Sequence, residues 1–274
     1  MTSQTARAAT PKSPILLRQI NGSVAILTLN RPEARNSLSE ALIADLDATL
    51  REFQDDATVR AVVIAANGPA FCAGHDMREL TARRADADRG RAYFKQLMDA
   101  CSAMMMAIVR LPKPVIAAVQ GPATAAGCQI VASCDLAVAS EAAGFCTPGV
   151  NIGLFCSTPM VALSRNVPRK HAMEMLLTGE MLPAEQAQRI GLINRIVAAG
   201  TERESAIALA QSITRKSSAT LKIGKEAFYR QAEMSLEDAY RYASAVMVDN
   251  MLIADAQEGI GAFLEKRAAK WEDR

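Results

Sequence analysis

Residues 121–135 read GPATAAGCQIVASCD, a run of small residues followed by a single amide, Gln129, in an otherwise apolar stretch. The preceding residues 115–120 (VIAAVQ) predict a strand, and the pattern predicts a helix that begins near Ala126. Glycine and alanine at such a junction allow a ligand to approach the backbone closely. They also allow a helix to pack tightly on a sheet, so the stretch alone is compatible with a binding loop or with close packing.

A second junction of the same kind lies at residues 70–80, AFCAGHDMREL. Asp76 stands where a helix N-cap is expected, and Glu79 completes a capping-box pattern. His75 then precedes the helix, and its backbone N–H is expected to point outward from the positive end of that helix. Two such N–H groups, at His75 and Ala126, could converge on one anionic oxygen, which is what an oxyanion hole requires.

The rest of the pattern predicts an α/β fold with a mostly parallel sheet covered by helices. Strand patterns alternate with amphipathic helix patterns up to about residue 200, and only helix patterns follow. We therefore expect a flexible tail at 1–13, an α/β core at 14–200 and a C-terminal helical region at 201–274. The expected strands are 14–20, 23–30, 60–66, 115–120, 134–140 and 192–197, the first two forming a hairpin, and the expected helices are 39–55, 89–110, 201–215, 217–233, 235–249 and 251–270.

The composition argues against several classes of function. The 274 residues carry a formal net charge of +2 and only 4% aromatic residues, so nothing indicates a nucleic-acid or membrane partner. The six cysteines are scattered, which indicates reduced thiols in an intracellular protein rather than disulfides or a metal site. The acid-free tail is compatible with a simple flexible segment or with the remnant of a transit peptide. We expect a cytoplasmic protein, or one of the mitochondrial matrix if the source is eukaryotic.

Four motifs, in this order, resemble those of the enoyl-CoA hydratase/isomerase (crotonase) superfamily. They are LNRPEARNSLS at 29–39, AFCAGHDMREL at 70–80, LPKPVIAAVQGPATAAGCQIVASCD at 111–135 and EGIGAFLEKRAAKW at 258–271. The resemblance covers residues 14–271. It implies a crotonase-like spiral of ββα turns, a C-terminal helical region that builds a homotrimer or a hexamer, and an acyl-CoA thioester as the bound partner. It implies no metal and no cofactor other than the coenzyme A that is part of the substrate.

The resemblance also implies roles for particular residues. The backbone N–H groups of His75 and Ala126 match the two donors that hold the thioester carbonyl oxygen. The residues that match positions lining the CoA are Arg35, Ala73 and Arg78, and those that match positions completing a neighbouring subunit's CoA site are Phe263 and Lys266. For the charged and aromatic side chains the alternative is a solvated charge or a packed ring.

The two glutamates that the family's hydratases use for proton transfer are missing. The matching positions are Gln129 and Gly149, and neither residue can exchange a proton. Among residues 114–164 the only charged side chains are Asp135, expected at the start of a strand, and Glu141, expected on an exposed turn. The resemblance therefore implies that the usual proton chemistry is lost or moved to another group.

Several functions stay open at this point. One is a CoA-thioester enzyme of acyl-CoA or fatty-acid metabolism with weak or non-standard hydratase activity. Another is a decarboxylase or thioesterase on the same scaffold, since AGHD at 73–76 also occurs in the family's methylmalonyl-CoA decarboxylases. A third is a non-catalytic acyl-CoA-binding protein. A nucleophilic Cys146 or Cys156 is a fourth alternative, but no motif places a His to activate either thiol.

Overall fold

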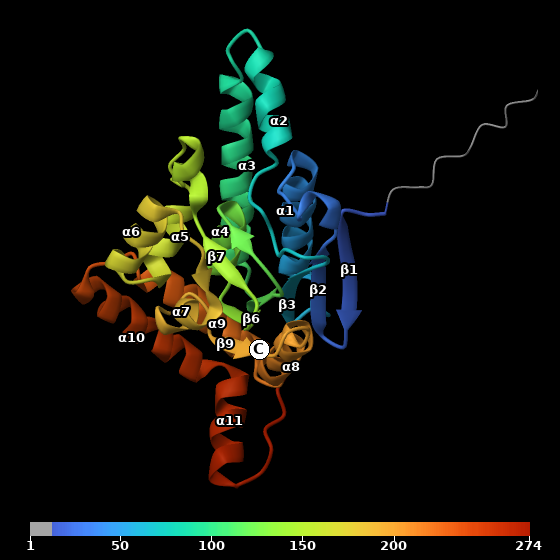
Figure 1. Cartoon of the computed structure of the whole chain (residues 1–274). Coiled ribbons are helices and arrows are strands. Elements are labelled where there is room, and N and C mark those ends of the chain that lie inside the picture. The colour runs from blue at the N-terminus through green and yellow to red at the C-terminus, as the bar shows by residue number, and fades with distance from the viewer. Residues whose placement is uncertain (1–12) are drawn as a thin grey trace, which may run out of the picture.

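A six-stranded sheet forms the centre of the molecule (Figure 1). The computed structural model describes residues 13–274, so the tail predicted at 1–13 lies outside the described residues except for its last residue. β1 and β2 form the predicted antiparallel hairpin, and the next strands continue parallel to β2. The α/β class with a mostly parallel sheet is therefore confirmed. The strand order is β1 (Leu16–Asn21), β2 (Val24–Leu29), β3 (Ala61–Ala66), β4 (Val115–Val119), β6 (Leu136–Ser140) and β9 (Arg195–Val197).

A second, three-stranded sheet lies beside the first and was not predicted from the sequence. Its strands are β5 (Ala123–Thr124), β7 (Gly144–Cys146) and β8 (Leu182–Pro183), with β7 in the middle. Strands of two or three residues are too short to show the alternation that predicts a strand. β5 is followed at once by helix α4 (Ala126–Ser133), so this small sheet fixes the start of that helix.

Helices cover both faces of the central sheet because alternate residues of its buried strands point to opposite sides. Ala25, Leu27 and Leu29 of β2 pack on the side of helices α1 (Glu40–Asp55) and α3 (Arg91–Arg110). Val24 and Ile26 pack on the other side, against helix α8 (Glu202–Thr214). α8 lies in the part of the chain predicted to be helical only, and its packing makes it part of the cover of the central sheet.

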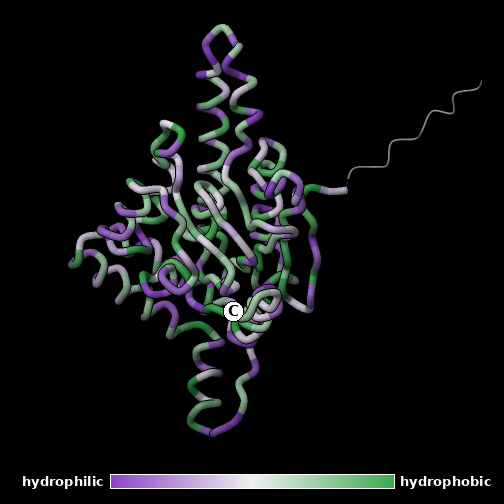
Figure 2. Tube along the Cα trace, viewed as in Figure 1, coloured by the Kyte–Doolittle hydropathy of each residue, from purple (hydrophilic) through white to green (hydrophobic). Residues whose placement is uncertain are grey.

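Short helices connect these layers, and one of them contributes to the projection at the top of Figure 1. α2 (Met77–Ala82) and the start of α3 form an arm that projects beyond the sheet. Figure 2 shows that the tip of this arm is hydrophilic. A 3-10 turn at Pro148–Ile152 leads to α5 (Pro159–Asn166), α6 (Arg169–Thr178) and α7 (Ala184–Arg189).

The C-terminal helices leave much apolar surface uncovered. They are α9 (Ser218–Gln231), α10 (Leu236–Leu252) and α11 (Ala254–Leu264). None of the helices within residues 13–274 is long and apolar enough to cross a membrane. An apolar face of this size on one chain is typical of a surface that meets another protein chain. Its large side chains that are more than half exposed are Phe228, Leu236, Tyr240, Met247, Val248, Met251, Leu252, Ile260, Phe263 and Leu264.

The last residues return from the end of α11 to the body of the molecule (Figure 1). The carboxylate of Asp255, which is 1% exposed, accepts hydrogen bonds from the backbone N–H groups of Glu272 at 2.7 Å and Asp273 at 3.0 Å. Asp273 in turn pairs with Arg60 beside the start of β3, with 3.0 Å between the closest N and O. These bonds connect α11 to the central sheet through the chain end.

Candidate functional site

The loops that follow β2, β3 and β4 meet at the carboxyl edge of the central sheet. The Leu38 N–H donates to the Gly74 carbonyl at 2.7 Å, which joins the first loop to the second. The Thr124 N–H donates to the Cys72 carbonyl at 2.9 Å, which joins the second loop to the third. Crevices at this edge of a parallel sheet are the usual place for ligands, because successive loops converge there. The two junctions singled out in the sequence therefore lie side by side.

The two candidate backbone donors, His75 and Ala126, have no hydrogen-bond acceptor for their N–H groups within residues 13–274. Gly74 shows how close the two junctions are. A β-carbon built on Gly74 would lie 3.5 Å from the Ala126 nitrogen and 3.0 Å from the Ala125 β-carbon. Two unpaired N–H groups on adjacent junctions are the arrangement that binding a carbonyl or anionic oxygen needs.

The glycines next to these junctions are explained by close packing, which was the alternative interpretation of the small residues in the sequence. A β-carbon on Gly127 would lie 2.1 Å from the Cys72 carbonyl oxygen, and one on Gly121 would lie 2.5 Å from the Pro69 carbonyl oxygen. No side chain fits at either position. Close packing thus accounts for these two glycines, whereas it does not account for the unpaired N–H of Ala126.

Ala125, between β5 and α4, has an unusual backbone conformation. Its φ of 50° and ψ of −116° lie in a region that residues other than glycine rarely adopt. Its own N–H donates to the Cys146 carbonyl of β7 at 2.9 Å, which fixes the turn from the strand side. Strained backbone of this kind is held by the surrounding structure and is concentrated at functional sites.

The start of α2 differs from the predicted capping box. Asp76 is the N-cap and accepts from the Arg78 N–H at 3.1 Å, as expected. The Glu79 carboxylate does not accept a hydrogen bond from the N-cap backbone N–H. It accepts instead from the Glu40 N–H at the start of α1, at 2.9 Å. The capping-box interpretation of Glu79 was therefore wrong. Glu79 therefore joins two helices. This role could be predicted only with the knowledge that α1 and α2 begin next to each other.

The His75 side chain is a half-buried polar group to which the sequence analysis gave no role. Its Nε2 atom is buried and has no hydrogen-bond partner in the described residues. Burial lowers the pKa of His75, so the imidazole is neutral at physiological pH. A neutral ring next to the two backbone donors adds no positive charge to the site.

Gln129 lies in the first turns of α4 and is 5% exposed. Its Oε1 atom is buried and has no hydrogen-bond partner in the described residues, whereas Nε2 is not among the buried unpaired atoms. A buried acceptor oxygen without a partner is rare in folded proteins, because buried polar groups are nearly always hydrogen-bonded. The unpaired amide oxygen is therefore a candidate ligand-binding group.

Gly149, the second position that the resemblance matches to a glutamate, has no room for a side chain. A β-carbon there would lie 2.7 Å from the Leu154 carbonyl oxygen and 2.9 Å from the Cys156 sulfur. Its φ is not in the left-handed region, so space rather than backbone conformation requires the glycine. The loop that carries Leu154 and Cys156 occupies the place from which a side chain at 149 would extend.

The cysteines near this loop are protonated thiols at neutral pH. Burial raises the pKa of Cys146 to about 11, and it raises the pKa of Cys156 although the Gly149 N–H partly opposes the change. All six cysteines are free and buried, and no group of residues able to hold a metal occurs in the described part of the chain. A thiolate nucleophile at Cys146 or Cys156 is thus not favoured by its surroundings.

The two charged residues considered as substitutes for the glutamates lie elsewhere. The Asp135 carboxylate accepts from Lys225 Nζ at 2.7 Å, from the Tyr229 hydroxyl at 2.9 Å and from the Val115 N–H at 2.7 Å. Val115 begins β4, whereas the candidate site follows the end of that strand, so Asp135 is at the opposite edge of the sheet. Glu141 is exposed on the turn between β6 and β7, as predicted.

The residues matched to CoA contacts fall into two places. Arg35 and Arg78 are exposed at the carboxyl edge, and the Ala73 N–H donates to the Arg35 carbonyl at 3.0 Å, so the loops that carry them are adjacent. Phe263, which is 80% exposed, and Lys266 lie at the end of α11, far from the arm and from α4 in Figure 1. A single chain therefore does not bring together all five residues that were matched to CoA contacts.

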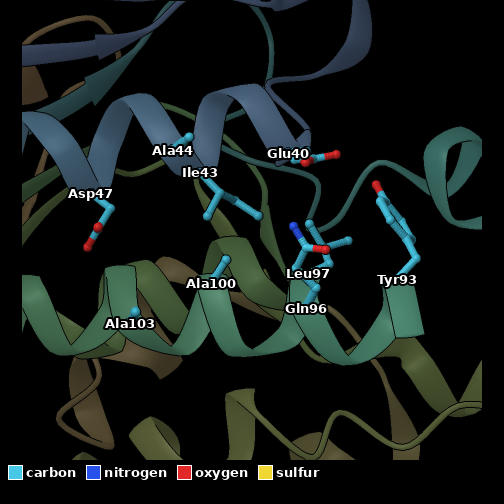
Figure 3. Close-up of a pocket in the computed structure, with 9 residues that line it drawn as sticks. All are labelled: Glu40, Ile43, Ala44, Asp47, Tyr93, Gln96, Leu97, Ala100 and Ala103. Carbon is cyan, nitrogen blue, oxygen red and sulfur yellow. The ribbon is translucent and has the colours of Figure 1, made fainter. Parts of the chain in front are cut away.

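A groove between α1 and α3 contains none of the predicted site residues (Figure 3). Its volume is about 300 Å³, and its floor is formed by alanines with Glu40 and Tyr93 at one end. The buried Asp47 Oδ1 along this groove has no hydrogen-bond partner in the described part of the chain. Nothing in the motifs points to this groove, which lies on the outer helical layer.

Comparison with known proteins places this arrangement in a family. The family model for enoyl-CoA hydratase/isomerase matches residues 19–274. The chain is 45% identical over 269 residues to enoyl-CoA hydratase domain-containing protein 3, mitochondrial, from Rattus norvegicus, covering 97% of this chain and 88% of the relative.

Solved structures agree with the sequence comparison. A crystal structure of enoyl-CoA hydratase from Mycobacterium smegmatis has 50% identity and a TM-score of 0.90, covering 94% of this chain and 99% of that one. The crystal structure of human enoyl-CoA hydratase domain-containing protein 3 has 43% identity and a TM-score of 0.89, covering 94% of this chain and 100% of that one. The chain belongs to the enoyl-CoA hydratase/isomerase (crotonase) family.

Proposed function

We propose that this protein binds an acyl-CoA thioester with the carbonyl oxygen between the N–H groups of His75 and Ala126. In this position the two donors stabilise the enolate of the thioester, while hydration of a double bond is weak or absent. The observation that carries the proposal is the pair of unpaired N–H groups on two junctions that touch at Gly74. The neutral Gln129 and the side-chain-free Gly149 support the loss of hydration.

Magnitudes indicate which chemistry such a site retains. A positioned general acid or base typically contributes about 10²–10⁴ in rate, so the absence of both carboxylates removes most of the catalysis of hydration. An oxyanion donor contributes about 10²–10³, and this part of the site is kept. Reactions whose main barrier is enolate formation, and simple binding of an acyl-CoA, both remain compatible with what is left.

We also propose that the protein assembles into a homotrimer or a hexamer through its C-terminal helices. The uncovered apolar face of α9, α10 and α11 supports an interface between chains. In such an assembly Phe263 and Lys266 of one chain would complete the CoA site of its neighbour, as the family resemblance implies. The relatives named mitochondrial suggest the mitochondrial matrix for a eukaryotic source and the cytoplasm otherwise.

Calorimetric titration with acetyl-CoA and a longer acyl-CoA tests the binding proposal. The Ala126→Pro variant removes one donor N–H at a helix position where proline is tolerated. We expect this variant to lose affinity for acyl-CoA while its affinity for coenzyme A itself, which has no thioester carbonyl to hold, is unchanged. Circular dichroism checks that the variant is folded. Absence of acyl-CoA binding by the unaltered protein up to millimolar ligand contradicts the proposal.

A turnover screen then separates the functions that share this site. Enoyl-, malonyl- and saturated acyl-CoAs report hydration, decarboxylation and thioester hydrolysis. Turnover of none of them, with binding retained, indicates a non-catalytic acyl-CoA-binding protein. Light scattering at micromolar concentration tests the assembly, and a stable monomer would contradict it.

A further inference from the structure

The proposed enolate forms only if a group removes a proton from the carbon next to the thioester carbonyl, here called C2. The two positions that the resemblance matches to glutamates are an amide, Gln129, and a glycine, Gly149, so neither supplies a base. An oxyanion hole stabilises the charge that develops on the oxygen, but it does not take up the proton. The base must therefore be another titratable side chain beside the two backbone donors.

The backbone around His75 turns its N–H towards the loop that carries Ala126. Leu38 bonds both neighbours of His75 on one side: its N–H donates to the Gly74 carbonyl at 2.7 Å, and its carbonyl accepts from the Asp76 N–H at 2.9 Å. In such a parallel bridge the N–H of the middle residue points to the opposite side. The loop that carries Ala126 pairs with this segment on that side. A carbonyl oxygen held between the two donors therefore lies next to His75.

The ring of His75 has a nitrogen with no partner in the fold. Nε2 is buried and forms no hydrogen bond within residues 13–274, whereas Nδ1 is not among the buried unpaired atoms. The residue as a whole is half-buried, so part of it stays open to a ligand. A neutral imidazole holds its hydrogen on one nitrogen and a lone pair on the other. With the hydrogen on Nε2, the lone pair of Nδ1 is free to accept a proton.

The ring and the first donor belong to the same residue, which brings the ring close to the ligand. A thioester oxygen bound to the His75 N–H lies about 2.9 Å from the backbone nitrogen. C2 is bonded to the carbonyl carbon, so it lies within the space that the side chain of the same residue can reach. Holding a base and the reacting carbon together in this way makes proton transfer efficient.

The charged groups around His75 are paired or exposed and do not compete for this role. Asp76 pairs with Arg31, with 3.0 Å between N and O, and the Glu79 carboxylate accepts from the Glu40 N–H at 2.9 Å. Residues 120–128 carry no charged side chain. Burial lowers the pKa of His75, so its ring is neutral at physiological pH. The other charged residues of the adjacent loops and helix starts, all exposed, are Glu33, Arg35, Glu40 and Arg78.

We propose that His75 is the base that removes a C2 proton from the bound thioester, so that the protein catalyses enolisation of acyl-CoAs. This inference rests on the proposed function and names the chemistry of the same site. The C2–H bond breaks and its proton passes to Nδ1. The electron pair of that bond forms a double bond between C2 and the carbonyl carbon, and the carbonyl π electrons move to the oxygen, where the His75 and Ala126 N–H groups stabilise the charge. The ring exchanges its proton with solvent and returns one to C2, so no other reactant is consumed.

Proton NMR of butyryl-CoA in deuterated buffer tests this inference. We expect the C2 hydrogens to be replaced by deuterium while the other hydrogens of the butyryl chain remain. A positioned base contributes about 10²–10⁴ in rate, so the exchange should exceed that in buffer alone by at least about a hundredfold. Calorimetric titration with the same ligand shows that it is bound under these conditions.

His75→Asn assigns the exchange to the ring, because asparagine keeps the backbone N–H and has a polar side chain that cannot take up a proton. At saturating butyryl-CoA, where a change of affinity has no influence, we expect the exchange rate to fall by about 10²–10⁴. His75→Gln serves the same purpose if the asparagine variant fails to fold. His171→Asn is the matched control, because His171 is the only other histidine of the chain and is exposed on α6. It should keep the exchange rate of the unaltered protein.

The pH dependence identifies the kind of base. The base must be unprotonated, so a ring whose pKa is lowered by burial gives a constant rate at neutral and alkaline pH and a falling rate only below the ordinary histidine value of about 6.5. A thiol such as Cys146, whose pKa burial raises to about 11, gives a rate that still rises at about pH 9. That rise, exchange that persists in His75→Asn, or bound butyryl-CoA that does not exchange overturns the inference alone. Failure of every acyl-CoA to bind overturns the proposed function as well.

Discussion

Replacing Ala125 by glycine should stabilise the protein, the opposite of what an alanine-to-glycine change usually does. Ala125 has φ 50° and ψ −116°, in a region open to glycine and unfavourable for a residue with a β-carbon. The turn is fixed on one side by the bond from its N–H to the Cys146 carbonyl and on the other by the start of α4. The strain therefore remains in the folded protein and is relieved only by removing the β-carbon.

The size of the effect follows from three contributions. A residue held in such a region costs about 1–3 kcal/mol, and glycine removes this cost. Glycine also makes the unfolded chain more flexible, which destabilises the folded state by about 0.4–1 kcal/mol. Loss of the half-buried methyl group of Ala125 removes at most about 0.8 kcal/mol more. With each contribution taken at the middle of its range, the balance is a stabilisation of about 1 kcal/mol, or a rise in Tm of about 2–4 °C.

Chemical denaturation at a fixed protein concentration measures this change. The matched control is Ala132→Gly, in the same helix, where the backbone is ordinary and the side chain is 5% exposed. Glycine in a helix interior is destabilising by about 1 kcal/mol relative to alanine, so this control should unfold more easily than the unaltered protein. If Ala125→Gly is destabilised as much as Ala132→Gly, the strain is absent and the reasoning about the turn is wrong.

Three further predictions concern space, charge and hydrogen bonding. Gly149→Ala should destabilise the protein by about 1–3 kcal/mol in denaturant unfolding, because its β-carbon would overlap a backbone carbonyl oxygen 2.7 Å away. Asp255→Ala should cost about 1–3 kcal/mol, because two backbone N–H groups lose their acceptor. Burial raises the pKa of Asp255, but hydrogen bonds from Ser217 and the chain end outweigh it and lower the pKa. Its stabilising contribution is therefore present at neutral pH and should be lost as the pH falls below about 4, measured by thermal melting. Tyr229→Phe should cost about 1 kcal/mol in denaturant unfolding through the lost bond to Asp135.

Much of the fold could be predicted because its long elements follow periodic patterns. Leu42, Leu46 and Leu50 repeat with the period of a helix, and they are buried in α1 where the pattern places them. The continuous apolar run of β3 similarly predicts a strand covered on both faces. The small sheet was missed because two- or three-residue strands are selected by their neighbours in space, and periodicity contains no information about those neighbours.

The candidate site could be predicted less completely, because its features depend on contacts between distant loops. The motifs identified the two junctions at His75 and Ala126, but the strain at Ala125 and the unpaired amide oxygen of Gln129 required the three-dimensional structure. Glu79 illustrates the limit. Its spacing from Asp76 suggested a local cap, whereas the carboxylate binds a helix that begins far away in sequence. The roles of the CoA-matched side chains stay predictions.

The proposed loss of the two carboxylates cannot be reversed by side-chain exchange alone. Glutamate at 149 has no space while the Leu154 carbonyl and the Cys156 sulfur occupy the place of its β-carbon. Glutamate at 129 alone would be a buried acid without a second carboxylate to share the proton transfers, so it should add little hydration. A combined Gln129→Glu and Gly149→Glu change would raise hydration only if the loop at 153–157 moved with it. The neutral amide and the loop therefore form one arrangement, which under the proposed function leaves two backbone N–H groups to bind a carbonyl oxygen without a pair of carboxylates to activate water.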